Sequence, residues 1–270
     1  ACHMWINANM PPGAEREQAH RQLCTTTGHP IDVATGKLIT RSIDLTLPGR
    51  IRFQFVRNYS SARLEPGPFG FGWRHSYQIE LIVTDEFVAH RDANGRLLPF
   101  ETIAVGGQTL NPVGELTLRR TADSYWVENV AGQRQRFAFA GGERHPLAEI
   151  VDDRGNSIQF THERGYLTRI RDTAGRTVRL EYDERGRATR LWIEKPNAHG
   201  AIEVRRYEYD AAGDLIAVRD AADQALRYEY AQHLLVRETD RLGYSFYFRY
   251  DHAGWCHETW GDGGVLARRV

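Results

Sequence analysis

Residues 176–186 read RTVRLEYDERG, and this stretch contains the unit that decides the fold. Apolar and charged side chains alternate from Thr177 to Tyr182, which is the period of a β-strand with one buried face. Asp183 then precedes Gly186 by three residues. An Asp carboxylate accepts backbone N–H bonds in tight turns, and Gly adopts the left-handed conformation that such turns need. The stretch therefore predicts one short strand followed by a chain reversal.

The same Asp-x-x-Gly unit recurs after about residue 146. Its Asp/Gly pairs are Asp152/Gly155, Asp172/Gly175, Asp183/Gly186, Asp210/Gly213, Asp240/Gly243 and Asp251/Gly254. Degenerate copies occur at His162/Gly165, at Asp220/Asp223 and at residues 230–233. Consecutive copies lie roughly ten residues apart, with about six strand residues between turns, so the chain is expected to fold as an antiparallel meander. Residues 194–201 interrupt the spacing as a loop insertion would.

The two faces of this predicted sheet differ in chemistry. Tyr, Leu, Ile and Phe alternate with Arg, Glu and Thr, so one face is expected to be buried and the other charged. Glu181, Glu208 and Glu229 are expected to oppose Arg179, Arg206 and Arg227, each exposed pair contributing about 0.2–1 kcal/mol. One such unit cannot bury its apolar face alone, so neighbouring units must stack.

The chain divides into three predicted parts. Residues 1–29 form a polar leader or plug with a helix expected at 13–24. Residues 30–146 form an N-terminal β-domain, because Ile51, Phe53 and Phe55 begin a period-two pattern. Within it, residues 92–95 (DANG) and 130–132 (VAG) are expected to be hairpin turns. Residues 147–270 form the repetitive sheet.

Composition excludes several functional classes. The 270 residues are 41% hydrophobic and 26% charged, which is globular composition. Lys+Arg and Asp+Glu number 35 each, so no net charge attracts nucleic acid or an anionic membrane. The three cysteines give no disulfide framework. No apolar run is long enough for a membrane span, and the first thirty residues lack the core of a signal peptide.

Three motifs in order resemble the Rhs/YD-repeat family. Tyr182-Asp183, Tyr209-Asp210 and Tyr250-Asp251 each begin a Tyr-Asp-x-x-Gly unit, from which the family takes its name. Residues 30–39 (PIDVATGKLI) look like the motif that opens the family's shell, and residues 67–77 (GPFGFGWRHSY) look like the block that follows it. The matching structural residues are Asp32, Gly36, Gly72, Trp73, His75 and Tyr77. The resemblance covers residues 30–270.

The resemblance implies a fold and a role. Family members wind a β-hairpin ribbon into a hollow cocoon, so the expected fold is all-β, with this chain forming part of a curved cocoon or barrel wall. The cocoon encloses a C-terminal toxin, and type VI secretion delivers members that carry a spike-tip domain into competing bacteria. The implied partners are the remaining shell repeats, the enclosed toxin, and spike or secretion components or a chaperone. The implied route is synthesis in the bacterial cytoplasm followed by export through a dedicated machine.

The chain departs from a whole family member in two respects. It lacks the aspartate-containing motif that ends the shell core, and no toxin-like tail follows Val270, so the repeats are expected to form only the opening turns of a shell. Some relatives are also cut before the Pro of the opening motif. The junction at the matching position is His29-Pro30. A cut there would release the leader, and a self-cleaving precursor remains one alternative function.

Candidate catalytic and metal sites have simpler interpretations. His75 and Ser76 are adjacent on a predicted strand, so they point to opposite faces and cannot form a dyad. Cys2, His3, His20 and Cys24 lack the paired spacing of a zinc site. The turn aspartates supply too few clustered oxygens for calcium. No catalytic residue, metal or cofactor is therefore predicted.

Two surface roles remain open. Interleaved Arg and Tyr resemble a nucleic-acid stacking surface, but Glu on the same strands cancels the field, so no nucleic acid is expected. A carbohydrate or cell-surface binding face is the second alternative, using Tyr207, Tyr209, Tyr228 and Tyr230 as aromatic platforms. An isolated wall segment would also leave open sheet edges. We therefore expect dimerisation, partner chains or protection of the edges by the leader.

Overall fold

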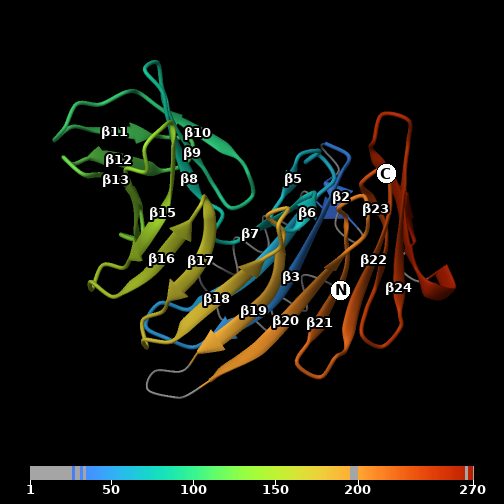
Figure 1. The fold of residues 1–270 in the computed structure, drawn as a ribbon. Helices are drawn as coiled ribbons and strands as arrows, with labels where there is room; N and C mark the ends of the chain where they lie inside the picture. Colours follow the sequence, from blue (N-terminus) through green and yellow to red (C-terminus); the bar gives the residue numbers. More distant parts are fainter. Residues whose placement is uncertain (1–25, 28–30, 33–34, 195–199, 265–266, 270) are drawn as a thin grey trace.

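The computed structural model consists almost entirely of antiparallel β-strands (Figure 1). It describes residues 26–27, 31–32, 35–194, 200–264 and 267–269. Within these ranges the only helical segment is the short 3-10 turn Asp262–Gly264. The all-β prediction is confirmed, whereas the predicted helix at 13–24 lies outside the described residues.

The Tyr-Asp repeats form one continuous meander, here called the ribbon. Each strand pairs antiparallel with the one before it, and together they make the curved sheet that crosses Figure 1 from yellow-green to red. Its strands are β15 (Arg144–Val151), β16 (Ser157–Glu163), β17 (Tyr166–Arg171), β18 (Thr177–Tyr182), β19 (Ala188–Glu194), β20 (Ala201–Tyr209), β21 (Leu215–Asp220), β22 (Ala225–Ala231), β23 (Leu234–Thr239), β24 (Ser245–Tyr250), β25 (Cys256–Gly261) and β26 (Arg268–Arg269).

The Asp-x-x-Gly turns between ribbon strands share one geometry. At Asp183, the N–H of Gly186 donates to the Asp183 carbonyl at 3.0 Å, and the N–H of Asp183 donates to the Arg187 carbonyl at 2.9 Å. The Asp183 side chain accepts the N–H groups of Arg185 and Arg187 at 3.0 and 2.9 Å. Gly186 has φ +76°. The carboxylate and the glycine thus act together within one reversal.

The other predicted Asp/Gly pairs repeat this turn. In each of them the glycine N–H donates to the aspartate carbonyl, and the glycine has a positive φ. The pairs are Asp152 with Gly155, Asp172 with Gly175, Asp210 with Gly213, Asp240 with Gly243, and Asp251 with Gly254. The predicted spacing of reversals therefore matches the observed meander.

One degenerate copy keeps the turn without its glycine. The N–H of Asp223 donates to the Asp220 carbonyl at 2.9 Å, and the Asp220 carboxylate accepts two backbone N–H groups, as at Asp183. Asp223 occupies the glycine position at φ +61°. The left-handed conformation is costly for a residue with a Cβ, though Asp tolerates it better than most.

The Tyr of each Tyr-Asp pair connects its repeat to the preceding one. It lies at a β-bulge directly before the turn, as the register shifts at 181/182, 208/209 and 249/250 show. From there its hydroxyl donates to a carbonyl of the preceding hairpin. The bonds join Tyr182 to Leu167 at 2.7 Å, Tyr209 to Ala188 at 2.7 Å, and Tyr250 to Leu235 at 2.9 Å. Adjacent repeats are thus joined by side chains as well as by the sheet.

The outer face of the ribbon carries a ladder of ion pairs. Glu208 pairs with Arg219 at 2.6 Å and Glu229 with Arg237 at 2.9 Å, both between neighbouring strands. The predicted partners Arg206 and Arg227 were wrong for these two glutamates. Glu181 does pair with Arg179, as expected. For Glu208 and Glu229, the register between neighbouring strands rather than closeness in sequence determines which arginine is the partner.

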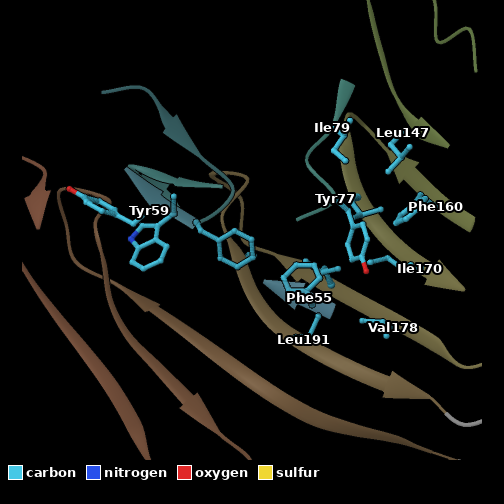
Figure 2. Close-up of a cluster of buried hydrophobic side chains, with 14 of the residues drawn as sticks. Phe55, Tyr59, Tyr77, Ile79, Leu147, Phe160, Ile170, Val178 and Leu191 are labelled. Atoms are coloured by element: carbon cyan, nitrogen blue, oxygen red, sulfur yellow. The ribbon is translucent and has the colours of Figure 1, made fainter. Parts of the chain in front are cut away.

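A second, smaller sheet, here called the N-terminal sheet, lies against the inner face of the ribbon. Its order is β1-β2-β3-β4-β7. Its strands are β1 (Thr26–Thr27), β2 (Ile31–Asp32), β3 (Lys37–Leu47), β4 (Phe53–Ser60) and β7 (Trp73–His75), and the short hairpin β5 (Pro66–Gly67) with β6 (Gly70–Phe71) precedes β7. Figure 2 shows Phe55 and Tyr77 facing Phe160, Ile170 and Leu191 of the ribbon. This contact is the centre of the hydrophobic core.

The remaining strands form a closed circuit beside the ribbon (Figure 1, upper left). They are β8 (Glu80–Val83), β9 (Val88–Arg91), β10 (Leu97–Phe100), β11 (Gln108–Asn111), β12 (Leu116–Arg120), β13 (Ser124–Asn129) and β14 (Arg134–Ala138). The predicted hairpins at 92–95 and 130–132 join β9 to β10 and β13 to β14.

Strand β15 belongs to both the circuit and the ribbon. Its first half, from Arg144 to Pro146, pairs with β8, and its second half, from Glu149 to Val151, pairs with β16. The proposed domain boundary at 146/147 therefore falls inside a single strand. The circuit and the ribbon share this strand and form one continuous β-structure.

Candidate functional site: the buried contact between the N-terminal sheet and the ribbon

An ion pair lies at the centre of the contact between the two sheets. Arg57 of β4 donates to Asp44 of β3 through Nε at 2.7 Å and through a second nitrogen at 3.0 Å. Their side chains are 0% and 2% exposed. Tyr207 of the ribbon donates its hydroxyl to the same carboxylate at 2.9 Å. The buried charge pair is therefore completed by a residue 163 positions away in sequence.

Burial and pairing act in opposite directions on this cluster. Desolvation alone would lower the pKa of Arg57, but the Asp44 carboxylate raises that pKa well above its usual value. Burial, and then the adjacent Asp44 carboxylate, raise the pKa of Tyr207, so its hydroxyl stays protonated and remains a donor. A fully desolvated pair of this kind depends on each partner, because either one left alone is an uncompensated buried charge.

Aromatic rings surround the Arg57 guanidinium. Its central carbon lies 4.9 Å from the Trp73 ring centroid and 5.9 Å from that of Tyr228. Trp73 in turn donates its indole N–H to the Tyr230 hydroxyl at 2.8 Å. Cation–π contacts of this kind are strongest where water is excluded. Two residues of the N-terminal sheet thus bind two tyrosines of one ribbon strand.

Hydrogen bonds donated by ribbon backbone N–H groups attach the N-terminal region to the ribbon at three separate points. The Leu235 N–H donates to the Tyr59 hydroxyl at 2.9 Å. The Ala188 N–H donates to the Pro68 carbonyl at 2.7 Å, and the Cys256 N–H donates to the Gly36 carbonyl at 2.8 Å. These points run from the start of β19 to the start of β25, so the N-terminal region fixes the spacing of several repeats.

Two glycines of the 67–77 block permit close approaches. Gly70 has φ +80°, and a Cβ added there would lie 2.5 Å from the Gly213 carbonyl oxygen. Gly72 has φ +79°, and a Cβ there would overlap the Tyr59 ring at 2.2 Å. Gly70 therefore brings backbone against the ribbon, and Gly72 makes room for the Tyr59 ring within the N-terminal sheet.

The remaining motif residues also have structural contacts. The Asp32 carbonyl accepts the Gly36 N–H at 2.8 Å, which closes the turn between β2 and β3. His75 stacks on Phe55 with ring centroids 5.2 Å apart, and burial lowers its pKa to about 3. Tyr77 stacks on Phe53 with ring centroids 5.3 Å apart.

The predicted turn glycines differ in how they relate to this contact. Gly213 lies against Gly70, so its turn is part of the contact. By contrast, the N–H groups of Gly175, Gly243 and Gly254 donate only within their own turns, at 3.0, 3.1 and 3.1 Å. Gly175 and Gly254 are half-buried and Gly243 is exposed. These three glycines therefore reverse the chain and do not contribute to the buried contact.

The His75 and Ser76 side chains serve different neighbours. The Ser76 hydroxyl donates to the Gln54 carbonyl at 2.9 Å, while the His75 Nδ1 atom accepts the Tyr77 N–H at 3.3 Å. Both groups are engaged with backbone, and neither is placed as a nucleophile or base for the other.

The ribbon tyrosines do not form an exposed platform. Tyr207 and Tyr228 are 3% and 2% exposed, so the prediction that their rings face a glycan was wrong. Tyr209 is half-buried with its hydroxyl bonded to Ala188, and half-buried Tyr230 is bonded to Trp73. The period-two pattern identified a tyrosine face correctly, but nothing in the repeats indicated that a second sheet would cover it.

Metal and cleavage predictions fall partly outside the described residues. Cys2, His3, His20 and Cys24, and the His29-Pro30 junction, lie in undescribed segments. Within the described ranges no group of three or more His, Cys, Asp or Glu is arranged to hold a metal ion. The described part of the chain also contains no helix with the length and apolar character of a membrane span.

Asp44 and Arg57 were missed by sequence reasoning. In β3 the buried positions include Thr40, Ser42 and Asp44, whereas Ile39 and Ile43 are 37% and 49% exposed. An amphipathic interpretation of this strand would point the wrong face inward. The available signal was a run of polar residues at alternate positions, which by itself does not distinguish a buried polar cluster from a solvated face.

Family models match two segments of the chain. The model described as "Domain of unknown function (DUF6531)" matches residues 28–100, and the model described as "RHS Repeat" matches residues 209–245. The first covers the N-terminal sheet and the first strands of the circuit, and the second covers ribbon strands whose turns were described above.

Three curated relatives are toxins or probable nucleases by name. Double-stranded DNA deaminase toxin A of Burkholderia cenocepacia is 27% identical over 81% of this chain and 16% of its own length. Probable deoxyribonuclease RhsA of Dickeya dadantii is 26% identical over 88% of this chain and 17% of its own length. Toxin protein Tse5 of Pseudomonas aeruginosa is 27% identical over 83% of this chain and 20% of its own length.

The chain thus spans a fifth or less of the length of these relatives. The two family models cover the glycine-rich block at 67–77, Asp44 and Arg57 of the buried contact, and the ribbon from Tyr209 to Ser245. With the repeat model matched on the ribbon and Rhs proteins among its relatives, the chain is similar to the Rhs/YD-repeat proteins.

Proposed function

We propose that this chain forms the opening section of a β-shell that encloses a C-terminal toxin in a larger Rhs protein. The observation that carries the proposal is the tyrosine connection between repeats, in which Tyr182, Tyr209 and Tyr250 each bond a carbonyl of the preceding hairpin. A wall made of units that attach to their predecessors extends by adding repeats, as solenoid folds do. The role is structural rather than catalytic.

The N-terminal sheet has a defined part in this proposal. It covers the inner face of the first repeats and pins them at Pro68, Tyr59 and Gly36. A single-layer sheet needs a second layer to bury its apolar face. The N-terminal sheet supplies that second layer for the first repeats. Elsewhere in the shell, further repeats and the enclosed toxin would cover the apolar face.

The surrounding biology follows from the family and the toxin relatives. In this proposal the protein is made in the bacterial cytoplasm and exported by a dedicated machine, such as type VI secretion, for competition between bacteria. Its partners are the remaining shell repeats, the toxin, and spike components or a chaperone.

Protease protection tests the shell role. In the toxin that carries this section, the C-terminal toxin domain should resist trypsin while the wall is intact. Deletion of residues 31–75, which removes the N-terminal sheet, should make the toxin domain cleavable. Deletion of residues 195–199, between β19 and β20 in the sequence, is the control and should leave protection unchanged. A toxin domain cut equally fast in the intact protein and in the sheet deletion would contradict the proposal.

We also propose that the mature shell begins at Pro30, after a cut at His29-Pro30. Ile31 is fully buried and pairs with Leu38, so the new end would stay anchored. Intact-mass measurement of the secreted toxin, with Pro30→Ala as the variant, tests this. A wild-type mass that retains residues 1–29 would contradict it.

A further inference from the structure

A wide cleft of about 1810 Å³ opens beside the N-terminal sheet. Its walls come from β3, β4 and β7, from the turn between β9 and β10, and from the ribbon turns at Gly165, Gly186 and Gly213. Segments that are distant in sequence therefore line the same cleft. The buried contact described above lies next to it and contributes mainly the edges of Trp73 and His75.

The cleft is lined predominantly by cations. The acidic residues among its lining are Asp32, Glu65 and Glu80, and lysines and arginines far outnumber them. Glu80 is shared by Arg91 and Arg144, at 2.9 and 3.1 Å.

Four lining cations lack a carboxylate partner. Lys37, Arg41, Arg96 and Arg185 are exposed, and within the described ranges no Asp or Glu oxygen lies within ion-pair distance of their charged groups. They come from β2–β3, from the β9–β10 turn and from a ribbon turn, so the excess charge spans the width of the cleft.

Two further arginines are crowded together at the base of the cleft. A Cβ on Gly95 would lie 3.6 Å from Arg63 Nε and 3.8 Å from Arg74 Nε, so both side chains pass close to this turn. Arg63 is bonded to the carbonyls of Asn58, Gly72 and Asn94. Arg74 donates to the Gln78 carbonyl, but its buried Nε has no hydrogen-bond partner in the described structure.

The register extends this cationic surface across the sheet. Arg41 pairs with Asn58, and Asn58 pairs with Arg74, so these side chains form one row over β3, β4 and β7. The row faces away from the ribbon, because Thr40 and Arg57, their neighbours in sequence, point toward it. Burial, and then repulsion from Arg74, lower the pKa of Arg63 to about 10, although the Asp92 carboxylate acts in the opposite direction.

The outer face of the ribbon differs in how its arginines are arranged. There Arg190, Arg206 and Arg249 each pair with a glutamate, at 3.3, 2.8 and 2.6 Å. Exposed Arg171 and Arg227 on that face have no carboxylate partner among the described ion pairs, but they lie apart, on β17 and β22. The cleft differs in that several such cations line one hollow.

We propose that the cleft binds an acidic polypeptide segment, whose Asp or Glu carboxylates bridge Arg41, Arg96 and Arg185. Arginine forks bind carboxylates through two parallel bonds, which suits exposed guanidinium groups placed around one cleft. Apolar lining such as Ile39 and Leu64 suits side chains between the carboxylates and favours a peptide over nucleic acid.

Fluorescence anisotropy with a labelled oligoglutamate peptide tests the site on the 270-residue chain. The expected result is saturable binding that weakens as salt rises. The triple variant Arg41→Gln/Arg96→Gln/Arg185→Gln should weaken binding by about tenfold or more, since three exposed ionic contacts are lost. An oligoglutamine peptide should not bind.

The matched control removes the same charge elsewhere. Arg190→Gln/Arg206→Gln/Arg249→Gln on the outer ribbon face should bind the peptide within about twofold of wild type. Both triple variants alter exposed residues, and urea unfolding verifies that they fold. Absent saturable binding, equal losses in the two triple variants, or tighter binding of a single-stranded oligonucleotide than of the peptide would each overturn the proposal.

Discussion

The ribbon and the N-terminal sheet reach their structures by different means. In the ribbon each Asp-x-x-Gly reversal is contained in four consecutive residues, such as 183–186, so the fold is determined locally and repeated. In the N-terminal sheet the decisive contacts are distant, and Asp44 finds a second hydrogen-bond partner, Tyr207, in the ribbon. A local turn tolerates the loss of one member, whereas a buried distant cluster does not. The predictions below test this difference.

The largest effect is expected at Arg57. Arg57→Met leaves the buried Asp44 carboxylate with only the Tyr207 hydroxyl and, at 3.8 Å, Arg205, and should reduce the free energy of unfolding by about 3 kcal/mol. Urea denaturation measures it. The control Arg206→Met removes an exposed pair and should cost less than about 1 kcal/mol. Similar losses in the two variants would remove the distinction between the regions.

The double variant Asp44→Leu/Arg57→Met tests whether the loss of stability comes from the unpaired carboxylate. Replacing both charges by apolar side chains leaves no uncompensated carboxylate, so it should be more stable than Arg57→Met alone. A double variant less stable than either single variant would show that the pair itself, with Tyr207, provides the stability.

Acid should affect buried His75 and the turn residue Asp251 in different pH windows. His75 has its pKa lowered to about 3 by burial, so the unfolded chain takes up the proton first. Its stabilising contribution is complete above about pH 6.5 and should fall by roughly 1.4 kcal/mol per pH unit as pH drops toward 3. The pKa of Asp251 in a ribbon turn is lowered mainly by the Trp255 N–H bond, so its contribution is lost only as pH falls below about 3.9.

Urea unfolding at several pH values measures these slopes. His75→Phe keeps a ring against Phe55 and should flatten the dependence between about pH 6 and about pH 4, whereas Asp251→Asn should leave that interval unchanged. An unchanged slope in His75→Phe would assign the acid response to other groups.

The next comparison uses two glycines with the same φ angle, one in the N-terminal region and one in the ribbon. Gly70 and Gly155 both have φ +80°, but only Gly70 faces backbone at close range, since nothing lies within 4 Å of a Cβ at Gly155. Gly155→Ala should cost about 1–2 kcal/mol for the left-handed conformation alone. Gly70→Ala should cost about 1–3 kcal/mol more, because backbone must move. Thermal unfolding compares them, and equal costs would mean that the contact with Gly213 is dispensable.

The smallest expected effect is a gain in stability at one ribbon turn. Asp223 holds the glycine position of a degenerate ribbon turn at φ +61°, so Asp223→Gly should stabilise the chain by about 0.5 kcal/mol after the entropic cost of glycine is included. Calorimetry is the measurement, and Gly155→Asp, where nothing lies within 4 Å of an added Cβ, is the reverse control, expected to destabilise. A loss in Asp223→Gly would show that the contact of its side chain with Arg219 outweighs the strain.

The sequence allowed the ribbon to be predicted and left the site largely hidden. Asp-x-x-Gly spacing sufficed for the turns, because the carboxylate and the glycine act within one turn. It did not predict that Glu208 pairs with Arg219, since that depends on register. The burial of Tyr207 and Tyr228 depends on a second sheet that no ribbon residue encodes. In β3, alternation suggested the wrong face because Asp44 is neutralised by a residue on another strand.

The direction of the tyrosine bonds has a consequence for biosynthesis. Every acceptor carbonyl, from Leu167 to Leu235, precedes its tyrosine in the chain. As a polypeptide leaves the ribosome, each new hairpin therefore meets a docking group that has already been made. Growth of the wall can keep pace with translation, one hairpin at a time, without waiting for any later segment to appear.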